Sequence, residues 1–314
     1  MSNELNFPIK YEYSYVNPGD YVSNPSLNLS YMYSNSRRKV IKILINTTNT
    51  TNTSHMFEGS LYLTKVALFD TSNVINMEDM FYGCELLRTI PQFNTPNNKS
   101  TRSMFMGCKL LRTIPLLDTS KVTDFGYMFM SCYALKSIPQ LVTSNATNMS
   151  YMFYGCELLT TIPQLVTSNA TNMSYMFYGC KLLTTIPQLD TGKVMDMSNM
   201  FYSCKLLESL PLLNCQSVTS MSNFFGYSDI LDKLVDLGGF KDLGKPSSVN
   251  GTNSRFLDNA PNLTHESLMN VINNLYDRKS NGLSNMSIKF GTTNLNKLSD
   301  EEKAIAINKG WNLS

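Results

Sequence analysis

The stretch LVTSNATNMSYMFYGCKLLTTIPQ, residues 165–188, is one copy of a 24-residue repeat that decides the fold of this chain. The preceding copy, residues 141–164, differs from it only in having Glu157 where the later copy has Lys181. A fixed period of this length indicates one structural unit that is stacked on copies of itself. Such an array builds an extended surface, which favours a binding function over catalysis.

Two columns of apolar side chains keep this period along the array. The first consists of Phe81, Phe105, Phe129, Phe153, Phe177 and Phe201, with Phe57 and Phe225 at its ends. The second consists of Cys84, Cys108, Cys132, Cys156, Cys180 and Cys204. We expect both columns to lie in the core. We expect the cysteines to be free thiols, because a uniform column offers no preferred disulfide pairing.

The pattern within one copy predicts a helix and a strand. Met173, Met176, Phe177 and Cys180 have the spacing i, i+3, i+4 and i+7, which places them on one face of a short helix. The segment 182–186 is rich in residues that favour strands, and Pro187 bounds it because proline cannot donate to a ladder. The predicted fold is therefore an α/β solenoid, a leucine-rich-repeat-like array of 24-residue strand–helix units with N- and C-terminal caps. Its strands would pair in parallel along the axis.

The repeat resembles the BspA-like branch of leucine-rich-repeat proteins. The resemblance is carried by the block from Met176 to Cys180, the block from Leu182 to Pro187, and the Asp-Thr-Ser turn at Asp70. It covers about residues 45–236. The resemblance implies a mostly non-enzymatic protein that attaches to proteins or cell surfaces, of the kind found in bacterial surface proteins and in phage or prophage virion proteins. It implies no catalytic motif.

The chain divides into four segments on this basis. Residues 1–44 form a Tyr-rich segment, in which Tyr11, Tyr13 and Tyr15 alternate with polar residues. It is interpreted either as a cap on the first copy or as an arm that docks onto a partner. Residues 45–236 form eight repeats, and residues 237–263 form a degenerate ninth repeat with an insertion around residues 244–251. Residues 264–314 form an α/β C-terminal cap.

The C-terminal cap has its own signals. The spacing of Leu268, Val271, Ile272 and Leu275 predicts an amphipathic helix, and residues 287–290 predict a strand. The segment 299–302 reads as a capping box that opens a last helix. Trp311, the only tryptophan, is expected to pack beneath that helix.

Two outward columns are candidate binding surfaces. The expected helix side carries Tyr82, Tyr127, Tyr151, Tyr154, Tyr175, Tyr178 and Tyr202. These tyrosines either pack on one another between copies or form an adhesive surface, since tyrosine gives contact area at low entropic cost. The expected strand side carries Arg88, Arg112, Lys136, Thr161 and Thr185. The alternative for that column is a solvated β face whose threonines favour strand geometry.

Nothing in the sequence singles out a catalytic, metal or cofactor site. The two histidines, His55 and His265, lie in different regions, and no CxxC motif is present. We therefore expect no enzyme activity and no cofactor. The net charge is only +2, and no basic stripe is interleaved with aromatics, so nucleic-acid binding is not expected.

The expected location of the protein is inferred from the first residues, which do not have the pattern of a signal peptide. Residues 1–20 show no charged segment followed by an apolar run, and no run approaches the length of a membrane span, so neither a signal peptide nor membrane insertion is expected. The first hypothesis is a phage virion component, assembled in the host cytoplasm, that contacts a protein or glycan receptor on the host. Residues 1–44 would join it to other virion proteins. The alternatives are a purely structural virion decoration protein and a bacterial surface adhesin; a homo-oligomer is left open.

Overall fold

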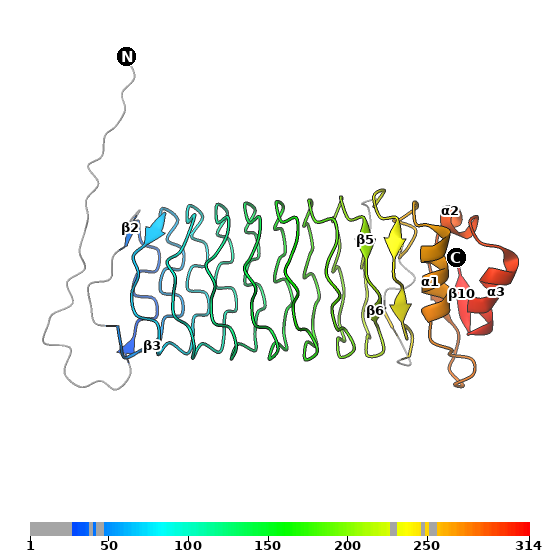
Figure 1. Cartoon of the computed structure of the whole chain (residues 1–314), viewed down its shortest axis with the longest axis horizontal. Coiled ribbons are helices and arrows are strands. Elements are labelled where there is room, and N and C mark those ends of the chain that lie inside the picture. Colours follow the sequence, from blue (N-terminus) through cyan, green and yellow to red (C-terminus); the bar gives the residue numbers. More distant parts are fainter. Residues whose placement is uncertain (1–26, 38–39, 42–46, 227–230, 246–248, 251–255) are drawn as a thin grey trace, which may run out of the picture.

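The computed structural model describes residues 27–37, 40–41, 47–226, 231–245, 249–250 and 256–314. The chain winds into a long array of stacked coils with a small helical cap at its C-terminal end (Figure 1). Regular elements are few and short. The strands are β1 (Leu27–Asn28), β2 (Val40–Ile41), β3 (Thr50–Asn52), β4 (Lys65–Val66), β5 (Ser209–Leu210), β6 (Leu213–Asn214), β7 (Asp236–Leu237), β8 (Phe240–Lys241), β9 (Met286–Ile288) and β10 (Trp311–Leu313). The helices are α1 (His265–Asn274), α2 (Thr292–Leu295) and α3 (Asp300–Asn308).

The predicted repeat solenoid is formed, and a column of stacked phenylalanine rings runs through its core. Ring centroids of successive phenylalanines from Phe57 to Phe201 are 5.1 to 5.7 Å apart, with the planes nearly parallel. Tyr33 extends this column at the N-terminal end, 5.6 Å from Phe57. At the other end Phe201 packs edge-on against Phe224, and Phe225 joins a cluster with Phe240 and Phe256. Offset-parallel and edge-on aromatic pairs are both favourable geometries.

The cysteine column is buried as predicted, and all seven cysteines of the chain are free thiols. Each column thiol donates to the carbonyl of the phenylalanine 27 residues earlier, as in Cys180 Sγ to Phe153 O at 3.2 Å. At the N-terminal end Ser60 takes the same position and donates to Tyr33 O at 2.8 Å. A second buried column consists of the threonines Thr71, Thr95, Thr119, Thr143, Thr167 and Thr191, whose hydroxyls donate to a carbonyl of the next coil. Cys215 stands in this threonine column.

The predicted helix between Met173 and Cys180 is not formed. The amide groups of Met176, Tyr178 and Cys180 donate to the carbonyl three residues back, whereas those of Met173, Tyr175, Phe177 and Gly179 donate to the next coil. The segment is therefore a series of overlapping turns. Tyr175 and Gly179 have φ values of 58° and 70°, as the third residue of a type II turn requires. The four apolar residues nevertheless point inward and are fully buried.

The helix prediction failed because a coil of successive turns has nearly the same period as a helix. The inward positions recur every three or four residues in both structures, so periodicity alone does not separate them. In the array, half of the amide groups find their acceptors in the neighbouring coil, at distances such as 2.9 Å from Phe153 N to Met176 O. Left-handed residues at every fourth position direct those amide groups along the axis. An isolated repeat offers no such acceptors.

Parallel pairing along the axis occurs, but mostly at another position than predicted. The strands expected at residues 182–186 and their equivalents appear only near the two ends of the array, where β2 pairs with β4 and β5 with β7. Between them, a single bridge per coil runs through the equivalents of Asn172, as in Asn148 to Asn172. The proline that follows each expected strand limits it, and β5 indeed ends immediately before Pro211.

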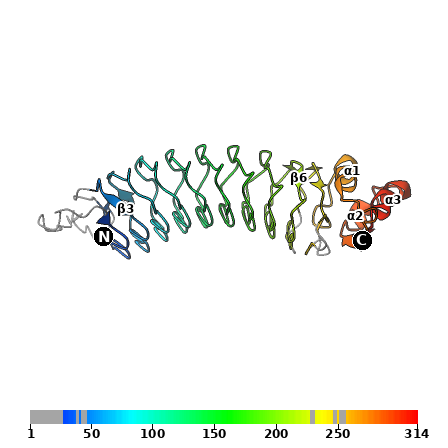
Figure 2. The same ribbon diagram turned by 90° about the horizontal axis from the view of Figure 1, so that it is seen from below.

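The coils are joined differently on their two sides. On the side of residues 171–180 and their equivalents, called here the tyrosine side, direct backbone bonds link successive coils. On the side of residues 182–190 and their equivalents, called here the proline side, direct backbone bonds link only some of the described coils, and glutamine side chains add links, as in Gln164 Nε2 to Gln188 O at 2.6 Å. Figure 2 shows that the array is curved, with β6 of the proline side at its outer edge.

The array begins earlier than the sequence indicated. The segment from Leu29 to Asn35 was assigned to the N-terminal cap, but its amide groups bond to the next coil in the same pattern as all later copies, starting with Leu29 N to Asn52 O at 2.8 Å. Residues 27–36 thus form a coil of the solenoid. The remaining part of that prediction, including Tyr11, Tyr13 and Tyr15, lies outside the described residues.

The predicted insertion in the ninth copy is divided between two places. Ser220 pairs with Asn250, 30 residues on, instead of the usual 24. Leu210 pairs with Leu237, an offset of 27, so half of the six extra residues precede β7 and half follow β8. The sequence placed the whole insertion around residues 244–251. Phe256, Leu257 and Ala260, which correspond to the Met, Phe and Cys positions of the repeat, are all buried.

The C-terminal cap agrees with the prediction. α1 buries Leu268, Val271 and Ile272, and β9 pairs in parallel with β10. The capping box of α3 is formed reciprocally by Ser299 and Glu302. Trp311 is fully buried, and its Nε1 donates to Tyr276 O at 3.0 Å. The buried Arg278 links the cap to the ninth copy, because its guanidinium donates both to Ser284 O of the cap, at 2.7 Å, and to Gly244 O of the ninth copy.

Candidate binding surface

One column of the tyrosine side, partly exposed at seven of its nine members, has left-handed backbone in each coil from Tyr31 to Asn223. It consists of Tyr31, His55, Asp79, Ser103, Tyr127, Tyr151, Tyr175, Asn199 and Asn223, with φ between 51° and 61°. We call it the left-handed column. Bulky side chains rarely adopt this conformation, which costs on the order of 1–3 kcal/mol. Because the core columns hardly change while this column does, the array presents different chemistry along its length.

Six of the seven predicted tyrosines form two adjoining rows of stacked rings. One row is Tyr127, Tyr151 and Tyr175, with centroids 4.6 and 4.4 Å apart. The other row is Tyr154, Tyr178 and Tyr202, with centroids 4.5 and 4.6 Å apart. The rows touch each other through pairs such as Tyr151 and Tyr154, at 5.7 Å. We call these six residues the tyrosine cluster.

The ring faces in this cluster are largely used within the protein. Each inner ring lies between two others, and the guanidinium of Arg102 lies 4.7 Å from the centre of the Tyr127 ring. At the other end Gly226 lies against Tyr202: a Cβ on Gly226 would be 3.5 Å from the ring. All six tyrosines are half-buried. The cluster therefore offers a partner ring edges and hydroxyl groups more than stacking faces.

The hydroxyl of Tyr151 stays neutral at physiological pH. Burial, together with the neighbouring phenols of Tyr175 and Tyr127, raises the pKa of Tyr151 to about 12. The hydroxyls of Tyr154 and Tyr202 have no hydrogen-bond partner among the described residues. Ser150 and Ser174, which precede two of these tyrosines, are buried, and their hydroxyls donate to Asn148 and Asn172 at 2.8 Å. Tyrosine is enriched in antibody paratopes, where it supplies contact area at low entropic cost.

Tyr82 does not belong to the tyrosine cluster. It lies in the same column as Tyr154, but its neighbours one coil away are Glu58 and Met106. Its side chain is 37% exposed and has no aromatic partner within the described coils. The prediction that Tyr82 extends the row is thus not met, because the row is interrupted by the two methionines of this column, Met106 and Met130.

A charged group that the sequence analysis did not single out lies N-terminal to the cluster, on the same side. His55 stacks on Tyr31 at 4.4 Å, and its Nδ1 lies 2.9 Å from Glu58 Oε2. Its Nε2 is 3.8 Å from Asp79 Oδ2. Burial raises the pKa of Asp79 against a lowering effect of His55. The signal was available in the sequence, because residues 31, 55 and 79 follow the 24-residue period.

The candidate residues of the proline side are exposed, as predicted. Arg88, Arg112, Lys136, Thr161 and Thr185 all face solvent. The three cations lie in successive coils at equivalent positions, immediately before the position that β5 occupies in Figure 1. Direct backbone contact between these coils occurs here, with Lys136 N donating to Arg112 O at 3.0 Å.

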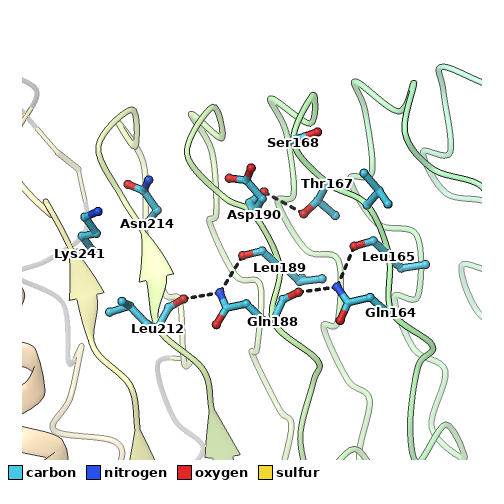
Figure 3. A pocket seen from close by; sticks show the side chains of 11 residues that line it. Gln164, Leu165, Thr167, Ser168, Gln188, Leu189, Asp190, Leu212, Asn214 and Lys241 are labelled. Atoms are coloured by element: carbon cyan, nitrogen blue, oxygen red, sulfur yellow. Dashed lines mark hydrogen bonds between the residues drawn. The ribbon is translucent and has the colours of Figure 1, made fainter.

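A groove on the proline side is lined mainly by groups that hold the coils together (Figure 3). Its volume is about 550 Å³, and Gln164, Gln188, Asp190 and Lys241 contribute to its lining. The Gln188 amide donates to Leu189 O at 3.0 Å and to Leu212 O at 2.7 Å, which joins its own coil to the next one. Asp190 Oδ1 accepts from Gly192 N at 3.1 Å. These polar groups serve the backbone, so the groove is a product of coil spacing.

The described residues contain no group of three or more metal-ligating side chains. The column thiols are buried, and burial raises the pKa of Cys84 to about 12, so these cysteines are poor nucleophiles. Within the same described part, no helix is both long and apolar enough to cross a membrane.

Comparison with known proteins places the chain in a family. Residues 27–140 and 134–237 match the family described as "Mycoplasma protein of unknown function, DUF285". These two overlapping matches span most of the solenoid, and the chain belongs to this family. No curated protein matches the chain.

Two solved structures are similar to the chain over most of its length. One is a leucine rich cell surface protein from Faecalibacterium prausnitzii A2-165, at 17% identity and a TM-score of 0.47, covering 98% of this chain and 86% of that one. The other is a leucine-rich repeat protein from Bacteroides ovatus ATCC 8483, at 15% identity and a TM-score of 0.25, covering 91% and 82%.

Proposed function

We propose that this protein is a non-catalytic binding protein that uses the outer surface of its solenoid to contact a protein or glycan at a cell surface. The observation that carries the proposal is the left-handed column: its side chains differ from coil to coil over a nearly uniform core. Seven of the nine members are at least partly exposed, and variation at exposed positions is what a recognition surface requires. The tyrosine cluster, which includes three of these members, is an uncharged patch of hydrogen-bonding groups.

The tyrosine cluster suggests how such a surface binds. Its ring faces are occupied, whereas the hydroxyls of Tyr154 and Tyr202 are free to donate or accept hydrogen bonds. A partner would then be recognised by hydrogen bonds to two rigidly held hydroxyls that lie two coils apart. Rigid tyrosines lose little entropy on binding, which supports this role.

Binding of the labelled full-length protein to cells and to a glycan array tests the proposal. The variant Tyr154→Phe/Tyr202→Phe keeps both rings and removes only their hydroxyls. We expect it to lose at least about tenfold in affinity, as the loss of one or two hydrogen bonds predicts. Tyr133→Phe is the matched control, since Tyr133 is 42% exposed and lies outside the tyrosine cluster. Equal affinity of all three proteins would refute the role of the cluster.

The setting of this binding is a separate proposal. We favour a virion component that meets the host surface; the alternatives are a bacterial surface adhesin and a structural decoration protein. Mass spectrometry of purified particles and of the surface fraction of the producing cells distinguishes the virion component from the bacterial surface adhesin. The protein would be found in the particles in the first case and in the surface fraction in the second. The decoration alternative predicts that particles without the solenoid still adsorb normally, whereas the favoured proposal predicts that they do not.

A further inference from the structure

Three positively charged side chains occupy equivalent positions in successive coils of the proline side. The described coils contain no other run of three like charges at equivalent positions. Arg88, Arg112 and Lys136 occupy equivalent positions in successive coils and are all exposed. None of the three has an acidic or other side-chain partner among the described residues. We call them the basic stripe. Neighbouring strands lie about 4.8 Å apart, so these charges repel one another at short range.

Elsewhere the array avoids such repulsion by pairing charges between coils. Lys109 Nζ lies 2.7 Å from Glu85 Oε1, and Lys181 Nζ lies 2.7 Å from Glu157 Oε1. Arg102 lies between Glu78 and Asp124, at 3.6 and 3.5 Å. The three cations of the basic stripe lack such partners among the described residues. An unpaired file of cations raises the local concentration of anions along the axis.

Hydroxyl groups lie directly beside the stripe. Thr89, Thr113 and Ser137 each follow one of the three cations and are likewise exposed. The hydroxyls of Thr89 and Thr113 make only long bonds to neighbouring carbonyls, at 3.3 and 3.4 Å. Guanidinium and ammonium groups next to hydroxyls suit the oxygens of sulfate or phosphate groups.

We propose that the basic stripe binds a linear surface polysaccharide that carries sulfate or phosphate groups, with the polymer running along the solenoid axis. The periodic charges of the protein would face the periodic charges of the polymer, so several weak contacts act together. The stripe is followed at the next coils by Thr160 and Thr184 and then by Glu208, so the polymer would lie on the N-terminal half of the array. This inference names the partner class of one face and rests on the proposed function.

The test uses heparin as the probe and the full-length protein. The variant Arg88→Gln/Arg112→Gln/Lys136→Gln removes the stripe, and Lys181→Gln/Lys193→Gln/Lys205→Gln removes the same net charge from other columns. We expect the stripe variant to lose at least tenfold in affinity for heparin, and the control variant less than threefold. We also expect the slope of log affinity against log salt to be smaller for the stripe variant. Thermal melting checks that both variants are folded.

Several outcomes would overturn the inference. Equal losses in the two variants would show attraction by net charge alone. Tighter binding to double-stranded DNA, or to vesicles of phosphatidylglycerol, than to heparin would assign the stripe to another partner. If the wild type binds cells through Tyr154 and Tyr202 but does not bind heparin, this inference fails and the proposed function stands. If the wild type binds heparin but no cells or glycans through those tyrosines, the proposed role of the tyrosine cluster fails instead.

Discussion

The guanidinium carbon of Arg102 lies 4.7 Å from the centre of the Tyr127 ring, at the point where the charged part of the left-handed column meets the tyrosine cluster. Arg102 also contacts Glu78 at 3.6 Å and Asp124 at 3.5 Å. The arginine therefore closes the exposed end of the ring stack and balances two carboxylates. A strained column of left-handed residues is held by such stacking contacts between coils.

Replacement of Arg102 should weaken this junction. Arg102→Ala removes the cation–π contact and leaves Glu78 and Asp124 without their cation, so we expect a loss of about 1 kcal/mol in the free energy of unfolding. Arg102→Lys should lose less, because a charge stays near the ring. Urea denaturation followed by circular dichroism measures the difference. An effect of the same size from Lys193→Ala, whose ammonium contacts only Asn169, would contradict a specific role.

Two serines occupy a column in which five described coils have glycine. Ser131 and Ser203 have φ values of 60° and 61°, in a column whose other members include Gly107, Gly155 and Gly179. Left-handed backbone costs an L-residue about 1 kcal/mol more than glycine. Ser131→Gly and Ser203→Gly should each raise the melting temperature by a few degrees. Gly155→Ala, at φ 71°, is the reverse change and should lower it; a stabilising Gly155→Ala would contradict the strain argument.

The sequence was sufficient to predict which residues form the core, but it was not sufficient to predict the backbone conformation between them. A period of 24 residues places Phe177 and Cys180 inside whatever the local structure is, because identical copies must stack in register. Whether the chain between Met173 and Cys180 is helical depends on where its amide groups find acceptors. Those acceptors lie in the next coil, on residues such as Met200. The contact is set by the stacking of copies, which no single repeat encodes.

The candidate surface shows the same limit. The tyrosines could be placed on one outward side from their spacing, and the stacking of Tyr151 on Tyr175 was one of two alternatives. The left-handed backbone beneath them could not be foreseen, because tyrosine disfavours it. The group around His55 was missed because its members differ in residue type, although they share the period.

The buried threonine column should be more important for stability than the exposed threonines. The Thr143 hydroxyl donates to Val166 O and accepts from Val166 N, both at 2.9 Å. Thr143→Val keeps the shape but leaves that amide and carbonyl without partners, which should cost about 1–3 kcal/mol. Thr161→Val is the control in the same part of the array, because Thr161 is exposed. Equal melting temperatures of the two variants would show that the Thr143 bonds contribute nothing.

The thiol column makes the fold sensitive to alkaline pH. Burial raises the pKa of Cys84 to about 12 and raises the pKa of the other six thiols, so the folded state keeps its protons when the unfolded state has lost them. Free energy of unfolding should therefore fall as pH rises above about 8.5, the ordinary pKa of cysteine. Each thiol contributes about 1.4 kcal/mol per pH unit in that range.

Cys132→Ser tests this dependence one thiol at a time. Serine is tolerated in the column, since Ser60 makes the equivalent hydrogen bond to Tyr33 at 2.8 Å, and it does not ionise in this range. The variant should show a shallower fall of stability between pH 9 and 11, by about 1.4 kcal/mol per pH unit. The wild-type thiols should react with a thiol reagent at pH 8 only after unfolding. Rapid labelling of the native protein, or parallel pH profiles for the two proteins, would show that the thiols are accessible and that burial does not control their ionisation.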